Sequence, residues 1–183
     1  MFIQTESTPN PATLKFLPGQ AVMEQGTAHF AAPDEAGPAP LAGSLFTTEG
    51  VIGVFLGADF ITVTKSADKE WEVMKPLILG AIMEHFQSGR PAMEGAVGEA
   101  TPSDGDEGEI VGQIRELIDT RVRPAVAQDG GDIVYKGLED GIVYLHMQGA
   151  CAGCPSSTAT LKHGIESMLK YYVPDGQEVR AFE

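Results

Sequence analysis

Apolar residues recur every three or four positions over 110–122, with charged residues between them, which predicts an amphipathic helix. Pro124 kinks or closes this helix, and Gly130-Gly131 ends it. Two β-rich runs follow, separated by Glu139-Asp140-Gly141, a sequence typical of a tight hairpin turn. The C-terminal part is therefore expected to run in the order α-β-β-α-β. Its expected strands are 133–138, 142–148 and Glu178–Phe182, and its second helix begins at Pro155 and buries Leu161, Ile165, Met168, Leu169 and Tyr172.

The N-terminal part has short apolar runs and predicts an α+β unit with more strand than helix. One helix is expected there, capped by Ser66 or Asp68. Pro76 lies inside its apolar pattern, so the helix is either kinked at Pro76 or begins later. Residues 31–43 (AAPDEAGPAPLAG) are expected to form a loop. The expected strands are 2–5, Thr13–Leu17, Val51–Leu56 and 60–65, and the apolar residues of the helix are Trp71, Met74, Leu77, Ile78, Ile82 and Phe86.

Residues 89–109 (GRPAMEGAVGEATPSDGDEGE) are rich in Gly, Pro, Glu and Asp and include no aromatic residue. Such a segment cannot bury enough apolar surface to offset the entropy lost on ordering. We therefore expect a flexible acidic linker over 89–109. The predicted fold class is α+β, with two small domains, 1–88 and 110–183, joined by this linker.

Composition and charge narrow the range of partners. The chain has 183 residues, of which 43% are hydrophobic, and a formal net charge of −14. This acidity repels phosphate backbones and anionic lipids, so neither nucleic acid nor a membrane is expected as a partner. The first residues, MFIQTESTPNP, lack the features of a signal or transit peptide. That favours a bacterial cytoplasm, with a matured organellar form as the alternative.

Cys151 and Cys154 are the only two cysteines, and they lie within GACAGCPSSTATLKHGIE at an expected strand-to-helix junction. Backbone amides and the helix dipole at such a junction stabilise a thiolate. The small residues around the pair let another backbone or a bulky inorganic group approach. The pair is therefore expected to be reactive and partly exposed. In a reducing compartment it is more often a metal site or redox centre than a structural disulfide.

The residues alone leave four interpretations of this pair open. The first is two incidental cysteines in a loop, and the second is thiol–disulfide exchange, although no βαβ unit flanks the motif. The third is zinc, which needs two more ligands; His146 and His163 are nearest, and both are expected to be satisfied or solvated instead. The fourth is a cluster shared by two chains, each giving two of four thiolates. A cluster held at such a contact is easily released, which suits a donor.

Segments in both halves of the chain resemble a known family. RP at 123–124, QDGGD at 128–132 and GACAGCPSSTATLKHGIE closely resemble the NifU-like C-terminal domain of Nfu-type proteins. The opening MFIQTESTPNPATLKFLPG, with Trp71 and the segment to Gly89, resembles the Nfu N-terminal domain. This resemblance covers nearly the whole chain except the linker. It implies an iron–sulfur cluster carrier without enzymatic turnover.

The resemblance also implies the details of the site. Cys151 and Cys154 are the implied ligands of a cluster shared between two subunits, usually [4Fe–4S] and alternatively [2Fe–2S]. The loaded protein is then a homodimer that receives its cluster from an upstream donor and passes it to client apo-proteins. The chain lacks the three-cysteine scaffold domain and the ferredoxin-like domain of longer NifU proteins, which favours a late carrier role. The leading alternative is a thiol–disulfide oxidoreductase using the same cysteines. The N-terminal domain is expected to be a docking module or an appendage that aids solubility.

Overall fold

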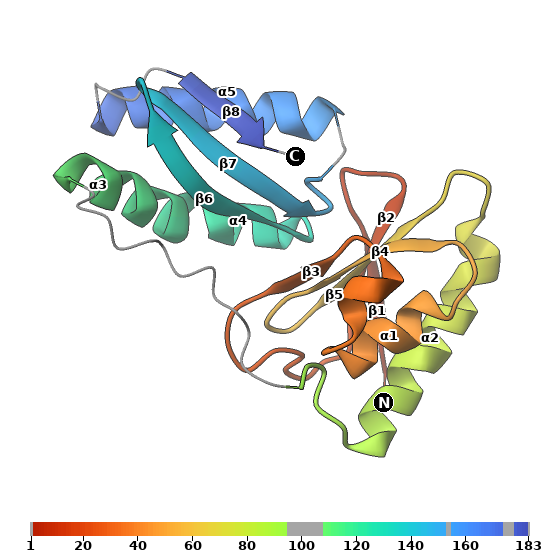
Figure 1. The fold of residues 1–183 in the computed structure, drawn as a ribbon. Coiled ribbons are helices and arrows are strands. Elements are labelled where there is room, and N and C mark those ends of the chain that lie inside the picture. Colours follow the sequence, from red (N-terminus) through yellow and green to blue (C-terminus); the bar gives the residue numbers. More distant parts are fainter. Residues whose placement is uncertain (1, 95–107, 153–154, 174–177, 183) are drawn as a thin grey trace. The chain divides into compact units, whose positions relative to one another are not determined.

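The computed structural model describes residues 2–94, 108–152, 155–173 and 178–182, with the backbone alone described at 155–158 and 181–182. The chain forms two compact units, Met1–Glu99 and Ala100–Glu183 (Figure 1). Each unit contains helices and a sheet, so the predicted class of two α+β domains is confirmed. Most of the expected linker lies outside the described residues, and the boundaries 1–88, 89–109 and 110–183 stay predictions. Within the described ranges, none of the helices is long and apolar enough to cross a bilayer.

The N-terminal unit contains a five-stranded antiparallel sheet in the order β1-β2-β5-β4-β3. Alternate strand residues, such as Phe16, Val54 and Ile61, are buried in one core with residues of the helices. The predicted strands Thr13–Leu17 and Val51–Leu56 have the observed bounds, whereas the other two predicted strands are displaced by one or two residues. The elements are β1 Gln4–Ser7, β2 Thr13–Leu17, β3 Ala28–Phe30, the 3-10 helix η1 Pro33–Ala36, α1 Pro40–Phe46, β4 Val51–Leu56, β5 Ile61–Lys65 and α2 Trp71–Ser88.

The prediction of a loop over 31–43 is wrong, because η1 and α1 occupy most of it. Each helix has a proline at its start, where the missing N–H removes no helical hydrogen bond. Helix α1 buries Leu41, Ala42 and Leu45 completely. The small residues that suggested a loop therefore let this short helix pack closely.

Helix α2 begins at Trp71, so the alternative of a start beyond Pro76 is wrong. The predicted caps are also wrong: Glu70 occupies the N-cap position without a capping side chain. Met74, Ile78 and Ile82 face the core, as predicted. Leu77 does not, since 57% of its surface is exposed.

The C-terminal unit has a three-stranded sheet in the order β6-β7-β8, with β6 and β7 antiparallel and β7 and β8 parallel. Buried and half-buried residues alternate along β7, which shows that the helices cover one face of the sheet. The order α-β-β-α-β is confirmed, with the first helix divided into three parts (Figure 1). The elements are α3 Glu109–Leu117, the π-helical turn Ile118–Val122, α4 Arg123–Gln128, β6 Gly131–Glu139, β7 Ile142–Gly149, α5 Pro155–Tyr172 and β8 Glu178–Phe182.

Pro124 interrupts the first helix without closing it. The π-helical turn Ile118–Val122 directly precedes it, and a widened turn accommodates the proline ring and the missing N–H. Gly130, with a φ of 80°, then ends the helical stretch as predicted. The hairpin turn is also confirmed, because Asp140 and Gly141 both have positive φ. Tyr172 is exposed and does not belong to the core, contrary to the prediction for α5.

Candidate metal centre

Cys151 lies in the turn that follows β7, four residues before α5 begins. The turn is held by backbone hydrogen bonds: the Ala150 amide donates to the Gly130 carbonyl at 3.1 Å, and the Ala152 amide donates to the Gly149 carbonyl at 3.1 Å. Gly149 has a φ of 63°, a left-handed conformation that favours glycine. This placement at a strand-to-helix junction agrees with the prediction. Cys154, the other predicted ligand, lies outside the described residues.

The expectation of partial exposure is wrong for Cys151. Only 2% of its surface is accessible, and it belongs to the apolar core of the unit with Ile133 and Met147. The reason is that Gly131 on the neighbouring strand β6, which is paired with Gly149, has no side chain. The space that this leaves on β6, called the notch below, holds the Cys151 sulfur. A Cβ at Gly131 would lie 2.6 Å from the Cys151 sulfur, well inside van der Waals contact.

The notch at Gly131 is a feature of the site that sequence reasoning missed. An added Cβ would also lie 2.8 Å from the Gln148 carbonyl oxygen and 3.1 Å from the Cys151 nitrogen. Two of the three closest atoms are therefore backbone atoms that no side-chain rotation can move. The paired glycines of QDGGD were the available signal: Gly130 ends the helix, and Gly131 makes room for the thiol.

The buried Asp132 forms an ion pair beside this notch with Arg123, which is partly exposed. The Arg123 Nε donates to Asp132 Oδ1 at 2.9 Å, and its second terminal nitrogen donates to Oδ2 at 2.9 Å. The Ile133 amide also donates to Asp132 Oδ1 at 2.8 Å, and the Asp132 side chain is only 4% exposed. The hydrogen bonds to Asp132 raise the pKa of the Arg123 guanidinium above its ordinary value. It ties the start of α4 to the start of β6.

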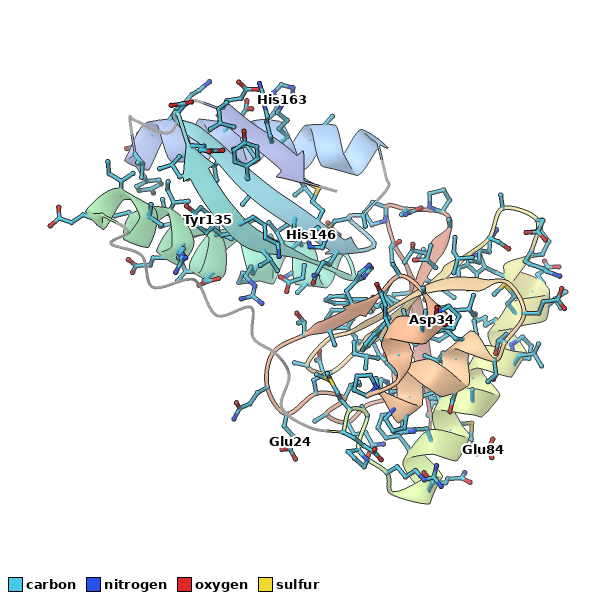
Figure 2. The ribbon with its side chains drawn as sticks, viewed as in Figure 1. Glu24, Asp34, Glu84, Tyr135, His146 and His163 are labelled. Atoms are coloured by element: carbon cyan, nitrogen blue, oxygen red, sulfur yellow. The ribbon has the colours of Figure 1, made fainter. Side chains whose placement is uncertain are left out.

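Neither of the two histidines considered as zinc ligands belongs to the apolar core that contains Cys151 (Figure 2). His146 lies between Leu145 and Met147 on β7, and those neighbours face the core that contains Cys151. Strand alternation therefore puts His146 on the opposite face, where burial, aided by Lys136, lowers its pKa. His163 lies on α5 with 81% of its side chain exposed and its Nδ1 3.9 Å from a Glu166 oxygen. Over the described ranges, no group of three or more His, Cys, Asp or Glu residues could hold a metal ion.

Comparison with known proteins identifies both units. The protein-family model for the N-terminal domain of scaffold protein Nfu/NifU matches residues 3–89, and the family model for the NifU-like domain matches residues 114–180. The chain is 52% identical over 182 residues to the human mitochondrial NFU1 iron-sulfur cluster scaffold homolog, covering 98% of this chain and 71% of that protein. It is 52% identical over 180 residues to the mitochondrial NifU-like protein 4 of Arabidopsis thaliana, covering 96% and 64%.

A solution NMR structure of a NifU-like protein from Saccharomyces cerevisiae aligns with a TM-score of 0.48 and 25% identity, covering 52% of this chain and 87% of that one. The two sequence relatives are longer, and the chain spans 71% and 64% of their lengths. Both relatives match it over nearly its whole length. The chain belongs to the Nfu family of NifU-like iron–sulfur cluster scaffold proteins.

Proposed function

We propose that this chain carries an iron–sulfur cluster as cargo, binds it through Cys151 and Cys154, and passes it to client apo-proteins. The observation that carries the proposal is the position of the only two cysteines, three residues apart between β7 and α5, within the matched NifU-like domain. Relatives named as iron–sulfur cluster scaffolds support the cluster as the cargo. Thiolates are the donors that such clusters require.

Two thiolates per chain fill half of the four positions of a [4Fe–4S] or [2Fe–2S] cluster. A second copy, related by a two-fold axis, supplies the other two. The loaded carrier is therefore a homodimer with the cluster between its subunits. The cargo is [4Fe–4S], with [2Fe–2S] as the alternative.

Loading requires a movement of Cys151, because its thiol is buried in the notch at Gly131. The turn that opens contains the small residues Gly149, Ala150 and Ala152, and its opening breaks the two backbone hydrogen bonds that hold it. The Arg123–Asp132 ion pair keeps the start of β6 fixed during this movement. Client thiolates then displace the carrier's ligands one at a time, and Cys151 returns to its notch.

Thiol–disulfide exchange by the same cysteines is the alternative, and it too needs the buried Cys151 sulfur to leave its notch. The relatives named as iron–sulfur cluster scaffolds favour the carrier. The chain is accordingly proposed as a carrier without enzymatic turnover. Failure of the apo-protein to reduce insulin disulfides would support this choice.

The partners of this carrier are an upstream cluster donor and the client apo-proteins, and the N-terminal unit serves to dock one of them. A cytoplasmic location stays a proposal. The relatives are named as mitochondrial proteins, which supports the organellar alternative.

Anaerobic reconstitution with iron and sulfide tests the proposal directly. We expect about four irons per two chains, with a dimeric mass only in the loaded form. Cys151→Ala and Cys154→Ala should each abolish cluster binding. Alanine is preferred to serine at position 151, because a serine hydroxyl would be buried in an apolar core. His163→Ala, at an exposed position near the motif, is the matched control and should load normally.

Three results would overturn the proposal: no bound iron, one zinc per chain with no change in mass, or a full cluster in either cysteine variant. About two irons per dimer would replace [4Fe–4S] with [2Fe–2S]. Insulin reduction that depends on Cys151 would instead establish thiol–disulfide exchange.

A further inference from the structure

Helix α2 is apolar on both of its faces, although only one of them meets the core. Met74, Ile78 and Ile82 are buried against the sheet of the N-terminal unit. On the opposite side, Val73 is 68% exposed and Leu77 is 57% exposed. A helix with apolar residues around its circumference is normally covered on all sides. The outer face of α2, defined by Val73, Pro76, Leu77, Gly80 and Glu84, therefore needs an explanation.

Two residues of this outer face weaken the helix without helping its own unit. Gly80 is exposed, and a Cβ added there would meet no heavy atom within 4 Å. The fold therefore does not require a glycine, which is less favourable than alanine inside a helix. Pro76 is also exposed to solvent, and it lies inside the helix rather than in its first turn. Because proline has no amide hydrogen, the Glu72 carbonyl lacks its usual helical donor. Gly80 thus leaves space beside Leu77 on the helix surface. Pro76 leaves the Glu72 carbonyl without its usual donor, so that carbonyl can accept a hydrogen bond.

The charges at the border of the outer face have one sign. Glu72 and Glu84 are exposed there, and Glu84 projects from α2 away from the sheet (Figure 2). Lys75 is half-buried and, at 100° per residue, lies on the flank of the helix toward the core. Two copies meeting through this face would bring carboxylates together in a chain of net charge −14. The charge pattern therefore disfavours a second copy and suits a positively charged partner.

We propose that the outer face of α2 docks an amphipathic helix of a partner protein that carries lysine or arginine beside its apolar residues. Gly80 admits an apolar side chain of the partner next to Leu77, as in the close packing of helices over small residues. The basic side chains pair with Glu72 and Glu84 and can donate to the Glu72 carbonyl, which lacks its usual helical donor at Pro76. This inference does not rest on cluster binding, since the N-terminal unit contains neither cysteine.

The test uses the full chain and two designed helical peptides of about 18 residues, one of leucine and lysine and one of leucine and glutamate. Backbone amide shifts in the ¹⁵N spectrum of the protein report where each peptide binds. We expect the lysine peptide to shift residues 72–84, to bind more weakly as salt is raised, and to lose about tenfold in affinity with Leu77→Ser or Gly80→Leu. The glutamate peptide should not bind. Ile52→Ser, which removes an equally exposed apolar side chain from β4, should leave binding unchanged.

Several results would overturn this inference. Shifts centred outside α2, equal binding of both peptides, or unchanged affinity in Leu77→Ser would each remove the proposed site. A concentration-dependent dimer of the apo-protein that Leu77→Ser abolishes would instead identify a second copy as the occupant. Both variants sit at exposed positions, and a thermal melt establishes that they fold.

Discussion

Replacing Gly131 with alanine adds one methyl group to the notch that holds the Cys151 thiol. The new Cβ would lie 2.6 Å from the sulfur, 2.8 Å from the Gln148 oxygen and 3.1 Å from the Cys151 nitrogen. Rotation of the cysteine side chain can relieve only the first contact. The other two require β6 to move away from β7 at the open end of the hairpin, where Gly131 is paired with Gly149.

The cost of this movement is that of overpacking a closely packed core, about 1–3 kcal/mol. Gly131 does not have a positive φ, so backbone strain adds nothing and the effect is steric. For a unit of this size, 2 kcal/mol corresponds to a fall in Tm of roughly 8–16 °C. The thiol should also leave its notch and become accessible.

Thermal and urea unfolding of the apo-protein, followed through the C-terminal unit, measure the first effect, and alkylation of Cys151 resolved by mass spectrometry measures the second. Gly164→Ala is the matched control, because an added Cβ at this position in α5 meets no heavy atom within 4 Å. That control should be neutral or stabilising by up to about 1 kcal/mol. A Gly131→Ala protein as stable as wild type, with an equally protected thiol, would refute the notch as the reason for the burial of Cys151.

Three further predictions concern the described contacts. Asp132→Asn should lower the stability of the C-terminal unit in urea by about 1–3 kcal/mol, because it leaves Arg123 without its buried partner. Asp119→Asn changes the exposed partner of the same arginine and should cost under about 0.5 kcal/mol. Equal losses of stability in the two variants would contradict the difference in burial. Burial lowers the pKa of His85, so the unfolded chain binds a proton at this residue more readily than the folded one. The stability that His85 contributes above about pH 6.5 should therefore be lost as pH falls through its folded-state pKa. Thermal melts of the N-terminal unit should depend less on pH in His85→Gln. Iodoacetamide should label Cys151 far more slowly in the native apo-protein than in urea, and similar rates would contradict its burial.

The sequence predicted most of the strands because their turns carry strong local signals. Asp140-Gly141 fixes the β6–β7 hairpin, and Pro155 marks the start of α5 as predicted. Local signals failed over 31–43, because proline and small residues are typical both of loops and of the start of a closely packed helix. The prolines and small residues of 31–43 suggested a loop, yet Pro40 begins α1, and Ala36, Ala39 and Ala42 of this segment pack in the core.

Exposure was less predictable than secondary structure. Apolar periodicity marks a helix but does not say which apolar face meets the core, so Leu77 and Tyr172 were placed inside. Cys151 was placed outside because its neighbours are small. Its burial depends on the register that pairs Gly131 with Gly149. The predicted turn alone would pair Gly131 with Ala150, and the irregularity between Tyr135 and Gly137 shifts the register by one residue.

The burial of Cys151 has a consequence for a carrier that must release its cargo. When the thiol leaves the core to bind a cluster, each chain loses burial worth about 1 kcal/mol, or about 2 kcal/mol for a dimer. That difference lowers cluster affinity roughly 30-fold without weakening any iron–thiolate bond. Gly131→Ala removes this competition, since its thiol no longer has a notch to return to. Once loaded, the variant should therefore transfer its cluster to an iron chelator more slowly than wild type, as followed by visible absorbance. Transfer at an equal or faster rate would mean that the notch holds the apo-protein together and does not help to release the cluster.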